Sequence, residues 1–363
     1  MVARRLEAAL DSAQAHGLDA LALLPGPDLF YMTGWDFHLS ERPIVALFPV
    51  DQTPAVILPA FEAGKVQNAQ VYPYTDEEGY VPAFHEACAA LELAEARVGV
   101  AALQMRLFEA RLLKRYAPGI ELVAVDELWA ELRLRKDADE LQAMRRAVAV
   151  AEQAFLAWLP QVRVGMTERE AAARLIAALL THGADKLAFE PIVAAGANGA
   201  LPHAVPGDRP LAPGDWLVVD WGAIVAGYVS DLTRAVVLGT PAGPLLDIWA
   251  IVARANAAGR AAARPGLPAE EVDAATRRVI EQAGWGSAFT HRTGHGIGLA
   301  VHEAPYITAG NAQLLGTGMT FTVEPGIYVP NLGGVRLEDD VLVTAQGSET
   351  LSTLAREPFV VPV

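Results

Sequence analysis

Residues 215–239 read DWLVVDWGAIVAGYVSDLTRAVVLG, two apolar runs joined by a short glycine-containing segment. This pattern predicts an antiparallel hairpin that turns near residues 225–227. Asp220 and Asp231 are eleven positions apart, an odd separation that places both side chains on one face of the hairpin. A two-residue turn at 225–226 would make them direct cross-strand partners, a position in which like charges are destabilising. Either a divalent cation offsets that repulsion, or both aspartates end their strands in solvent.

The chain has 363 residues, more than a single core usually organises, so we expect two domains. Up to residue 125, apolar runs such as PIVALFPV and TPAVILP alternate with helical patterns, which is typical of an α/β domain. From residue 215 onward strand-like runs dominate, with helices expected near 243–262 and 269–283. The sequence therefore predicts an α/β domain over residues 1–125 and an α+β domain with a largely antiparallel sheet over residues 126–363.

Composition narrows the functional classes. The formal net charge is −15, which disfavours nucleic acid and anionic membranes as partners. The single cysteine, Cys88, excludes an intramolecular disulfide, and its helical spacing from Phe84 and Leu91 indicates a buried helix residue. The first residues read as an amphipathic helix rather than a signal peptide, and no apolar run is long enough to span a membrane. We therefore expect a cytoplasmic protein.

Further acidic residues fall in strand-like settings. Glu324 ends the run MTFTVE, and the segment GVRLEDD offers Glu338, Asp339 and Asp340, among which spacing alone does not choose. The glycine-rich segment HRTGHGIGLAVHEAP adds three of the chain's eight histidines. Two aspartates, two glutamates and one imidazole would form a carboxylate-rich site for two cations such as manganese, cobalt or zinc. Such a pair of cations activates water for hydrolysis.

Competing motifs are missing from the sequence. HEAPY lacks the second histidine of HExxH, and the chain contains neither a GxSxG nucleophile elbow nor a phosphate-binding P-loop. The glycines of GHGIG do not match the dinucleotide fingerprint. A carboxylate-bound metal site therefore remains the interpretation that uses most of these residues.

Five segments carry a family resemblance: NGALPHA, DWG…SDLTR, HRTGHGIGLAVHEAP, FTVEPGIY and GVRLED, in this order over about residues 195–340. Together they resemble the pita-bread metallopeptidases, the group of prolidase, aminopeptidase P and methionine aminopeptidase. DLFYMTGW and HLSERP are similar to the amino-terminal domain of the prolidase and aminopeptidase P branch. The resemblance implies a creatinase-like α/β domain followed by a catalytic pita-bread domain with a curved sheet.

The resemblance also implies roles for single residues. It implies that Asp231 and Glu338 bridge two divalent cations, with Mn²⁺ favoured over Co²⁺ or Zn²⁺, and that a metal-bridging hydroxide attacks the scissile carbonyl. Glu324 would serve as general base, and His203 and His302 would lie near the substrate and the tetrahedral intermediate. His291 and Arg336 would line the pocket. The full set of implied metal ligands is Asp220, Asp231, His295, Glu324 and Glu338.

Xaa-Pro dipeptidase activity is the function this resemblance implies, on small proline-containing peptides. Aminopeptidase P or a proline-specific carboxypeptidase on the same scaffold are the alternatives, and a metal-free amidinohydrolase or a non-catalytic interaction protein are distant ones. In GWDFHLSERP, His38 and Arg42 resemble a loop that reaches the partner's active site in homodimeric bacterial prolidases. We therefore expect a homodimer in which Arg42 pairs with the substrate carboxylate, since a guanidinium matches a carboxylate well. A surface loop salt-bridged to itself is the alternative.

Overall fold

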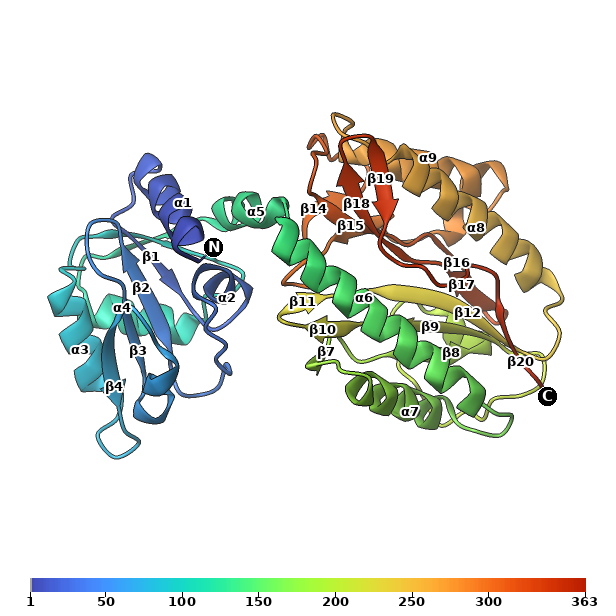
Figure 1. Cartoon of the computed structure of the whole chain (residues 1–363), viewed down its shortest axis with the longest axis horizontal. Coiled ribbons are helices and arrows are strands. Elements are labelled where there is room, and N and C mark those ends of the chain that lie inside the picture. The colour runs from blue at the N-terminus through green and yellow to red at the C-terminus, as the bar shows by residue number, and fades with distance from the viewer. Residues whose placement is uncertain (1) are drawn as a thin grey trace. The chain divides into compact units, whose positions relative to one another are not determined.

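The computed structural model describes residues 2–363, which divide into two compact units (Figure 1). The first unit extends to Arg133 and the second is Leu134–Val363. Two domains are therefore present, as the length of the chain predicts. The expected boundary near residue 125 lies directly before α5 (Asp126–Leu134), and the contacts place all but the last residue of this helix in the first unit.

Contacts from the end of α5 to α2 (Pro27–Thr33) account for this division. The Tyr31 hydroxyl donates a hydrogen bond to the Leu132 carbonyl oxygen at 2.8 Å. Arg133 forms an ion pair with Asp28, and both side chains are largely buried. These interactions attach α5 to the first unit, although the strands of that unit have already ended.

The first unit is an α/β domain built on one six-stranded mixed sheet of strand order β4-β3-β2-β1-β5-β6. Its central strands are fully buried runs of small and branched apolar residues, as the sequence predicts. Strands β2 and β3 pair antiparallel through a short turn, as the two runs separated by Asp51-Gln52 indicate. The elements are α1 (Val2–Ala15), β1 (Ala20–Leu23), β2 (Val45–Pro49), β3 (Ala55–Pro59), β4 (Gln70–Tyr74), α3 (Val81–Ala90), β5 (Arg97–Val100), α4 (Leu107–Tyr116) and β6 (Glu121–Ala124).

The second unit begins with two helices whose starts the local sequence fixes. Asp137 caps α6 (Ala138–Trp158) and Thr167 caps α7 (Glu168–Thr181), each in a reciprocal capping box with the glutamate three positions on. Both helices pack against the four-stranded sheet of order β20-β12-β9-β8. Its strands are β8 (Ile192–Ala195), β9 (Trp216–Trp221), β12 (Leu232–Leu238) and β20 (Phe359–Val361).

A second sheet, of order β14-β13-β15-β18-β19, packs against another helix pair, α8 (Pro244–Ala262) and α9 (Ala269–Gln282) (Figure 1). These two helices lie within a residue or two of the ranges that the sequence predicts. Most strand pairs of the unit are antiparallel, so the predicted α+β class is confirmed. The remaining strands are β7 (Lys186–Leu187), β10 (Ala223–Val225), β11 (Tyr228–Val229), β13 (Gly294–Gly296), β14 (Glu303–Ile307), β15 (Thr320–Val323), β16 (Gly326–Val329), β17 (Gly333–Arg336), β18 (Asp339–Thr344) and β19 (Gly347–Thr350).

The predicted hairpin is present, but its register differs from the expectation. The turn comprises Ala226 and Gly227, both with positive φ, because Val225 pairs with Tyr228. Asp220 therefore faces Thr233 rather than Asp231, and the prediction of a direct aspartate pair is wrong. In this register Asp231 is two positions from the partner of Asp220, so both still belong to one face of the sheet.

Two predictions from composition can be compared with the structure. Cys88 is buried in α3, and burial raises the pKa of its thiol to about 11, as expected for an inert core residue. Among residues 2–363, no helix has the length and apolar character that crossing a membrane requires.

Candidate metal centre

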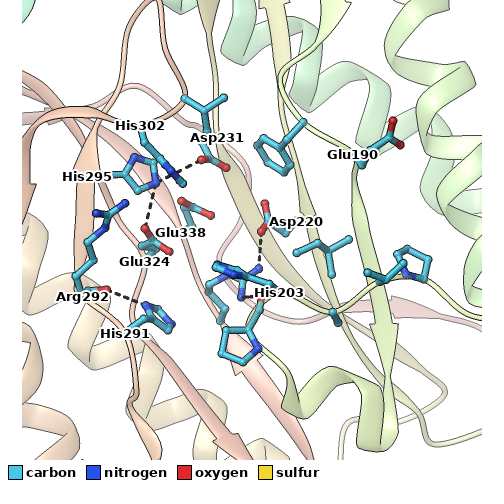
Figure 2. A pocket seen from close by; sticks show the side chains of 18 residues that line it. Glu190, His203, Asp220, Asp231, His291, Arg292, His295, His302, Glu324 and Glu338 are labelled. Carbon is cyan, nitrogen blue, oxygen red and sulfur yellow. Dashed lines mark hydrogen bonds and ion pairs between the residues drawn. The ribbon is translucent and has the colours of Figure 1, made fainter. Parts of the chain in front are cut away.

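The five residues expected to bind metal line one cavity of about 660 Å³ in the second unit (Figure 2). The histidines expected to contact substrate line the same cavity, together with Arg336. In sequence these side chains are spread over more than a hundred positions. The shared cavity contains Asp220, Asp231, His295, Glu324, Glu338, His203, His291, His302 and Arg336.

The ends of strands from both main sheets present the acidic groups. Asp220 is on β9 and Asp231 directly precedes β12, whereas Glu324 directly follows β15. Glu338 lies between β17 and β18, where its backbone N–H donates to the Thr233 carbonyl oxygen at 3.2 Å. That bridge connects β12 to the segment before β18, and it brings the acidic residues of the two sheets together.

His295 reaches the centre from β13, where two glycines allow close backbone approach. A Cβ on Gly294 would meet the Thr322 carbonyl oxygen at 1.8 Å, and one on Gly296 would meet the Ala304 carbonyl oxygen at 2.1 Å. Neither position has room for a side chain, because neighbouring backbone packs directly against it. The glycines that flank the histidine therefore allow the close packing that brings His295 to the centre.

Ligand atoms from three buried residues, Asp231, His295 and Glu338, all lie within 4.8 Å of one another. The imidazole Nε2 of His295 is 3.7 Å from Asp231 Oδ2 and 3.3 Å from Glu324 Oε1. In Figure 2 these side chains point toward a common centre, with Asp220 at its other edge. Oxygen donors with one nitrogen, at this spacing, suit divalent cations.

Burial and mutual repulsion dominate the electrostatics of this cluster. Burial, with nearby carboxylates adding to it, raises the pKa of Asp231 and Glu338 well above their usual ranges. Burial also raises the pKa of Glu324 to about 7 and that of Asp220 above its usual range. It lowers the pKa of His295 to about 3, which keeps the imidazole neutral and its nitrogen able to bind a cation.

A second layer of hydrogen bonds orients the acidic groups. The Thr233 hydroxyl donates to Glu338 Oε2 at 2.7 Å, and Arg336 donates from Nε to Thr233 Oγ1 at 3.0 Å and from Nη2 to Asp220 Oδ2. The backbone N–H of Asp231 donates to Asp340 Oδ2 at 3.1 Å. Such outer contacts fix the direction of metal-binding side chains.

The structure distinguishes the three acids that spacing left open. Glu338 faces the cavity. Asp339 alternates to the opposite face, where Arg234 and Arg356 bind its carboxylate. Asp340 returns to the first face as the acceptor for Asp231. The placement of Glu338 matches the ligand position that the family resemblance implies.

The other histidines differ in their surroundings. The rings of His302 and His295 lie 4.1 Å apart, and burial lowers the pKa of His302. His291 Nε2 is 2.9 Å from the Tyr328 hydroxyl, and burial lowers the His291 pKa to about 4. His203 lies on an exposed loop at the cavity edge. All three are neighbours of the acidic cluster in Figure 2.

His38 and Arg42 lie in the first unit, between α2 and β2. Arg42 donates from Nε and Nη2 to the two carboxylate oxygens of Asp76, both at 2.8 Å, and from Nη1 to Glu41. The guanidinium is thus engaged by acidic neighbours, in the manner of the salt-bridged surface loop named as the alternative. Its role toward substrate stays a prediction.

Residues 142–345 match the sequence model of Metallopeptidase family M24, and residues 5–135 match that of the Creatinase/Prolidase N-terminal domain. The chain belongs to metallopeptidase family M24. A relative in Mycobacterium tuberculosis, named probable dipeptidase PepE, is 37% identical over 99% of this M24 chain and 97% of its own length. The Xaa-Pro dipeptidase of Pyrococcus furiosus is 40% identical over 65% of this chain and 68% of its own.

Solved structures support the same family assignment for this M24 metallopeptidase. The crystal structure of a prolidase from Thermococcus sibiricus is 33% identical, with a TM-score of 0.95, and the match covers 99% of each chain. The predicted family, enzyme class and two-domain fold are therefore confirmed. Members of a metallopeptidase family require divalent metal ions, and the donor set fits them: among the described residues, nothing donates a hydrogen bond to the buried Oδ1 of Asp220.

Sequence reasoning missed several residues of the site. Arg292 lines the cavity, and its guanidinium lies 4.7 Å from the centre of the Tyr306 ring. Within residues 2–363, no carboxylate is in ion-pair range of Arg292, although its place beside His291 in HRTGHGIG was a usable signal. Thr233 had no such signal, because a hydroxyl is common next to any acidic strand end. Asp340 was one of the three acids that spacing left open, and its contact with Asp231 follows from the fold.

Proposed function

We propose that this protein is a Xaa-Pro dipeptidase that binds two divalent cations, with Mn²⁺ as the first candidate. The observation that carries the proposal is the convergence of four carboxylates and one neutral imidazole on a single cavity. The cavity is also lined by three further histidines, which supply polar groups for a substrate. The similarity to an Xaa-Pro dipeptidase and to a prolidase supports the choice of substrate.

In this proposal the two cations would be held by Asp220, Asp231, His295, Glu324 and Glu338. The bound cations supply a water of lowered pKa and polarise the scissile carbonyl. Glu324 Oε1, on the edge of the cluster next to His295, would act as general base and take up the proton of the attacking water.

Substrate contacts fall to the remaining polar groups of the cavity. His203 and His302 are placed to donate hydrogen bonds to the peptide, one from the loop at the cavity edge and one from beside His295. His291 and Arg336 are tied to the Tyr328 hydroxyl, at 2.9 and 2.8 Å, and shape the wall beneath them.

A dipeptidase must also recognise the substrate's C-terminal carboxylate. Arg42 was the sequence-based candidate, and Arg292 is a second one because it lines the cavity without an acidic partner among the described residues. A guanidinium binds a carboxylate through two parallel hydrogen bonds. Separate substitution of Arg292 and Arg42 distinguishes the two candidates.

A peptide panel with the Mn²⁺-loaded protein tests the function. Hydrolysis of Xaa-Pro, but not of Xaa-Pro-Yaa or of longer peptides that end in proline, is expected. Preference for Xaa-Pro-Yaa would indicate an aminopeptidase P, and release of C-terminal proline from longer peptides a carboxypeptidase. Activity that survives removal of metal would contradict the proposal, and hydrolysis of creatine-like compounds would favour an amidinohydrolase.

Three arginine variants assign the carboxylate contact. Arg292→Ala or Arg42→Ala is expected to raise KM for Xaa-Pro on the order of tenfold or more, since a charged hydrogen bond contributes about 1.5–3 kcal/mol. Arg145→Ala, which removes an exposed arginine paired with Glu349, is the matched control and should leave KM unchanged. If neither Arg292→Ala nor Arg42→Ala changes KM, both candidates are wrong.

A homodimeric assembly and a cytoplasmic location complete the proposal. The resemblance of the segment around His38 and Arg42 to a loop of homodimeric prolidases supports the first. Light scattering on the purified protein measures its mass, and a monomer at micromolar concentration would contradict the dimer.

A further inference from the structure

Glu168, at the start of α7, is a buried acidic residue away from the metal cluster. It is 1% exposed, whereas Arg169 and Glu170 beside it on the same helix are exposed. A buried carboxylate is unfavourable unless hydrogen bonds replace its hydration. The partners of Glu168 therefore show which part of the chain its burial serves.

Within residues 2–363, the three groups that donate hydrogen bonds to the Glu168 carboxylate come from one segment, residues 195–207, here named the His203 loop. Its Oε1 accepts from the Ala195 backbone N–H at 2.8 Å. Its Oε2 accepts from Asn198 Nδ2 at 2.7 Å and from the Gly207 backbone N–H at 2.9 Å. One carboxylate thus holds the first and the last residue of the loop, together with Asn198 near its beginning.

The His203 loop is also connected to the metal centre at Pro202, next to the histidine. Arg336 donates from Nη1 to the Pro202 carbonyl oxygen at 3.0 Å, and the same guanidinium donates to Asp220. A Cβ on Gly334 would meet the Gly199 carbonyl oxygen at 2.2 Å, so the loop packs directly on β17. The loop therefore has one anchor at the site and a second anchor, Glu168, at its base.

The part of the loop that carries the histidine is also held through Asn198, whose Nδ2 donates to the Val205 carbonyl oxygen at 3.1 Å, and Ala204 is buried. Leu201 and Val205, which flank His203, are 58% and 77% exposed. Within the described part of the chain, no group forms a hydrogen bond with the His203 imidazole. The position of that ring consequently depends on the backbone of its loop, and the backbone depends on polar anchors.

We propose that Glu168 is a positioning residue that holds the His203 loop so that the His203 imidazole meets the substrate. The inference rests on the proposed role of His203 in the peptidase site. Glu168 lies outside the cavity, so it would affect substrate binding through the loop and not through the metal cluster.

The variant Glu168→Gln tests this with almost no change in volume. A glutamine offers one acceptor oxygen where three N–H donors converge, and its amide group opposes at least one of them. We expect kcat/KM for Xaa-Pro to fall about tenfold, below the roughly hundredfold effect of a 1 Å misplacement, with bound Mn²⁺ unchanged. Amide hydrogen exchange in residues 195–207 should become about tenfold faster, because the loop opens more easily.

Two comparisons separate positioning from a general loss of structure. Glu170→Gln is the same change on the exposed face of the same helix. Its amide oxygen can still accept from the Thr167 backbone N–H, so loop exchange and kcat/KM should stay unchanged. In a His203→Ala background, Glu168→Gln should change kcat/KM by less than about twofold, because a residue that acts through His203 has nothing left to position.

Each outcome decides a separate point. Wild-type exchange rates in the Glu168→Gln loop would overturn the anchor, whatever the activity. A full tenfold loss that persists without His203 would overturn the link to that histidine, as would faster exchange with unchanged kcat/KM. A wild-type protein that is inactive on Xaa-Pro would refute the proposed function, while the exchange measurement would still report on the anchor.

Discussion

Lys136 and Glu303 form an ion pair inside the second unit, and we predict that breaking it destabilises the protein strongly. Lys136 Nζ lies 2.7 Å from Glu303 Oε1, and the two side chains are 1% and 5% exposed. The other oxygen, Oε2, accepts from the Ala300 backbone N–H at 3.2 Å. Because His302 precedes Glu303, this pair also anchors the segment that presents His302 to the cavity.

The magnitude follows from the burial of both charges. Lys136→Met keeps most of the side-chain volume but leaves the Glu303 carboxylate without its cation. Removing one partner of a buried pair costs about 3–5 kcal/mol. For a folded unit of this size, that corresponds to a fall in Tm of about 6–20 °C. The double variant Lys136→Met/Glu303→Gln should recover more than half of the loss, because its neutral amide still accepts from Ala300.

Calorimetry of the metal-loaded single and double variants measures both effects, with kcat/KM recorded below the unfolding transition. We expect the single variant to unfold earliest and to lose activity on Xaa-Pro at a temperature where it is still folded. A single variant within about 1 kcal/mol of the wild-type protein would refute the reasoning, since an exposed pair behaves in that way. A double variant no more stable than the single one would refute it as well.

Three further predictions concern the metal centre and the hairpin. Chelation should abolish hydrolysis and lower Tm, and Mn²⁺ at about 100 times its Kd should restore about 2.7 kcal/mol; a Tm that is indifferent to metal would contradict the cluster as the binding site. In metal-free protein, Asp231→Asn should raise Tm, because it removes one of several mutually repelling buried carboxylates. Titration calorimetry of the same variant should show weakened Mn²⁺ binding. A lower Tm would mean that the hydrogen bonds of this carboxylate outweigh the repulsion. Ala226→Asn should stabilise by about 1 kcal/mol in urea unfolding, because alanine is strained at φ 51° and asparagine tolerates that region. A destabilised variant would mean that the turn changes conformation.

The hairpin shows where sequence reasoning succeeds and where it fails. Alternation and the odd separation of Asp220 and Asp231 correctly place both on one face. The register was missed because the turn uses Ala226-Gly227, and alanine carries no preference for the left-handed conformation that it adopts here. A Cβ on Gly222 would meet the Ser230 carbonyl oxygen at 2.0 Å. No local sequence pattern predicts this close backbone contact.

For the acidic residues 338–340 and for Arg42, sequence reasoning was incomplete for a different reason. Strand alternation separates Glu338 from Asp339, but only the bridge to Thr233 decides which of them faces the cavity. Arg42 is bound by Asp76, a residue 34 positions away whose proximity follows from the fold of the first unit alone. Local pattern predicts elements and residue types, whereas the partner of each charge is set by tertiary contacts.

Arg336 is a buried basic side chain that connects several parts of the cavity with its four carboxylates. Its guanidinium donates to Asp220, to Thr233, to the Tyr328 hydroxyl and to the Pro202 carbonyl oxygen, and so joins the metal centre, the β16–β17 hairpin and the His203 loop. Removing Arg336 would therefore perturb metal binding and substrate contacts together. Among the described residues, the hydrogen bonds of the Glu168 carboxylate all go to the loop, so its loss should affect substrate handling alone. The two anchors of one loop thus separate the two halves of the site: the half that binds cations and the half that orients the peptide.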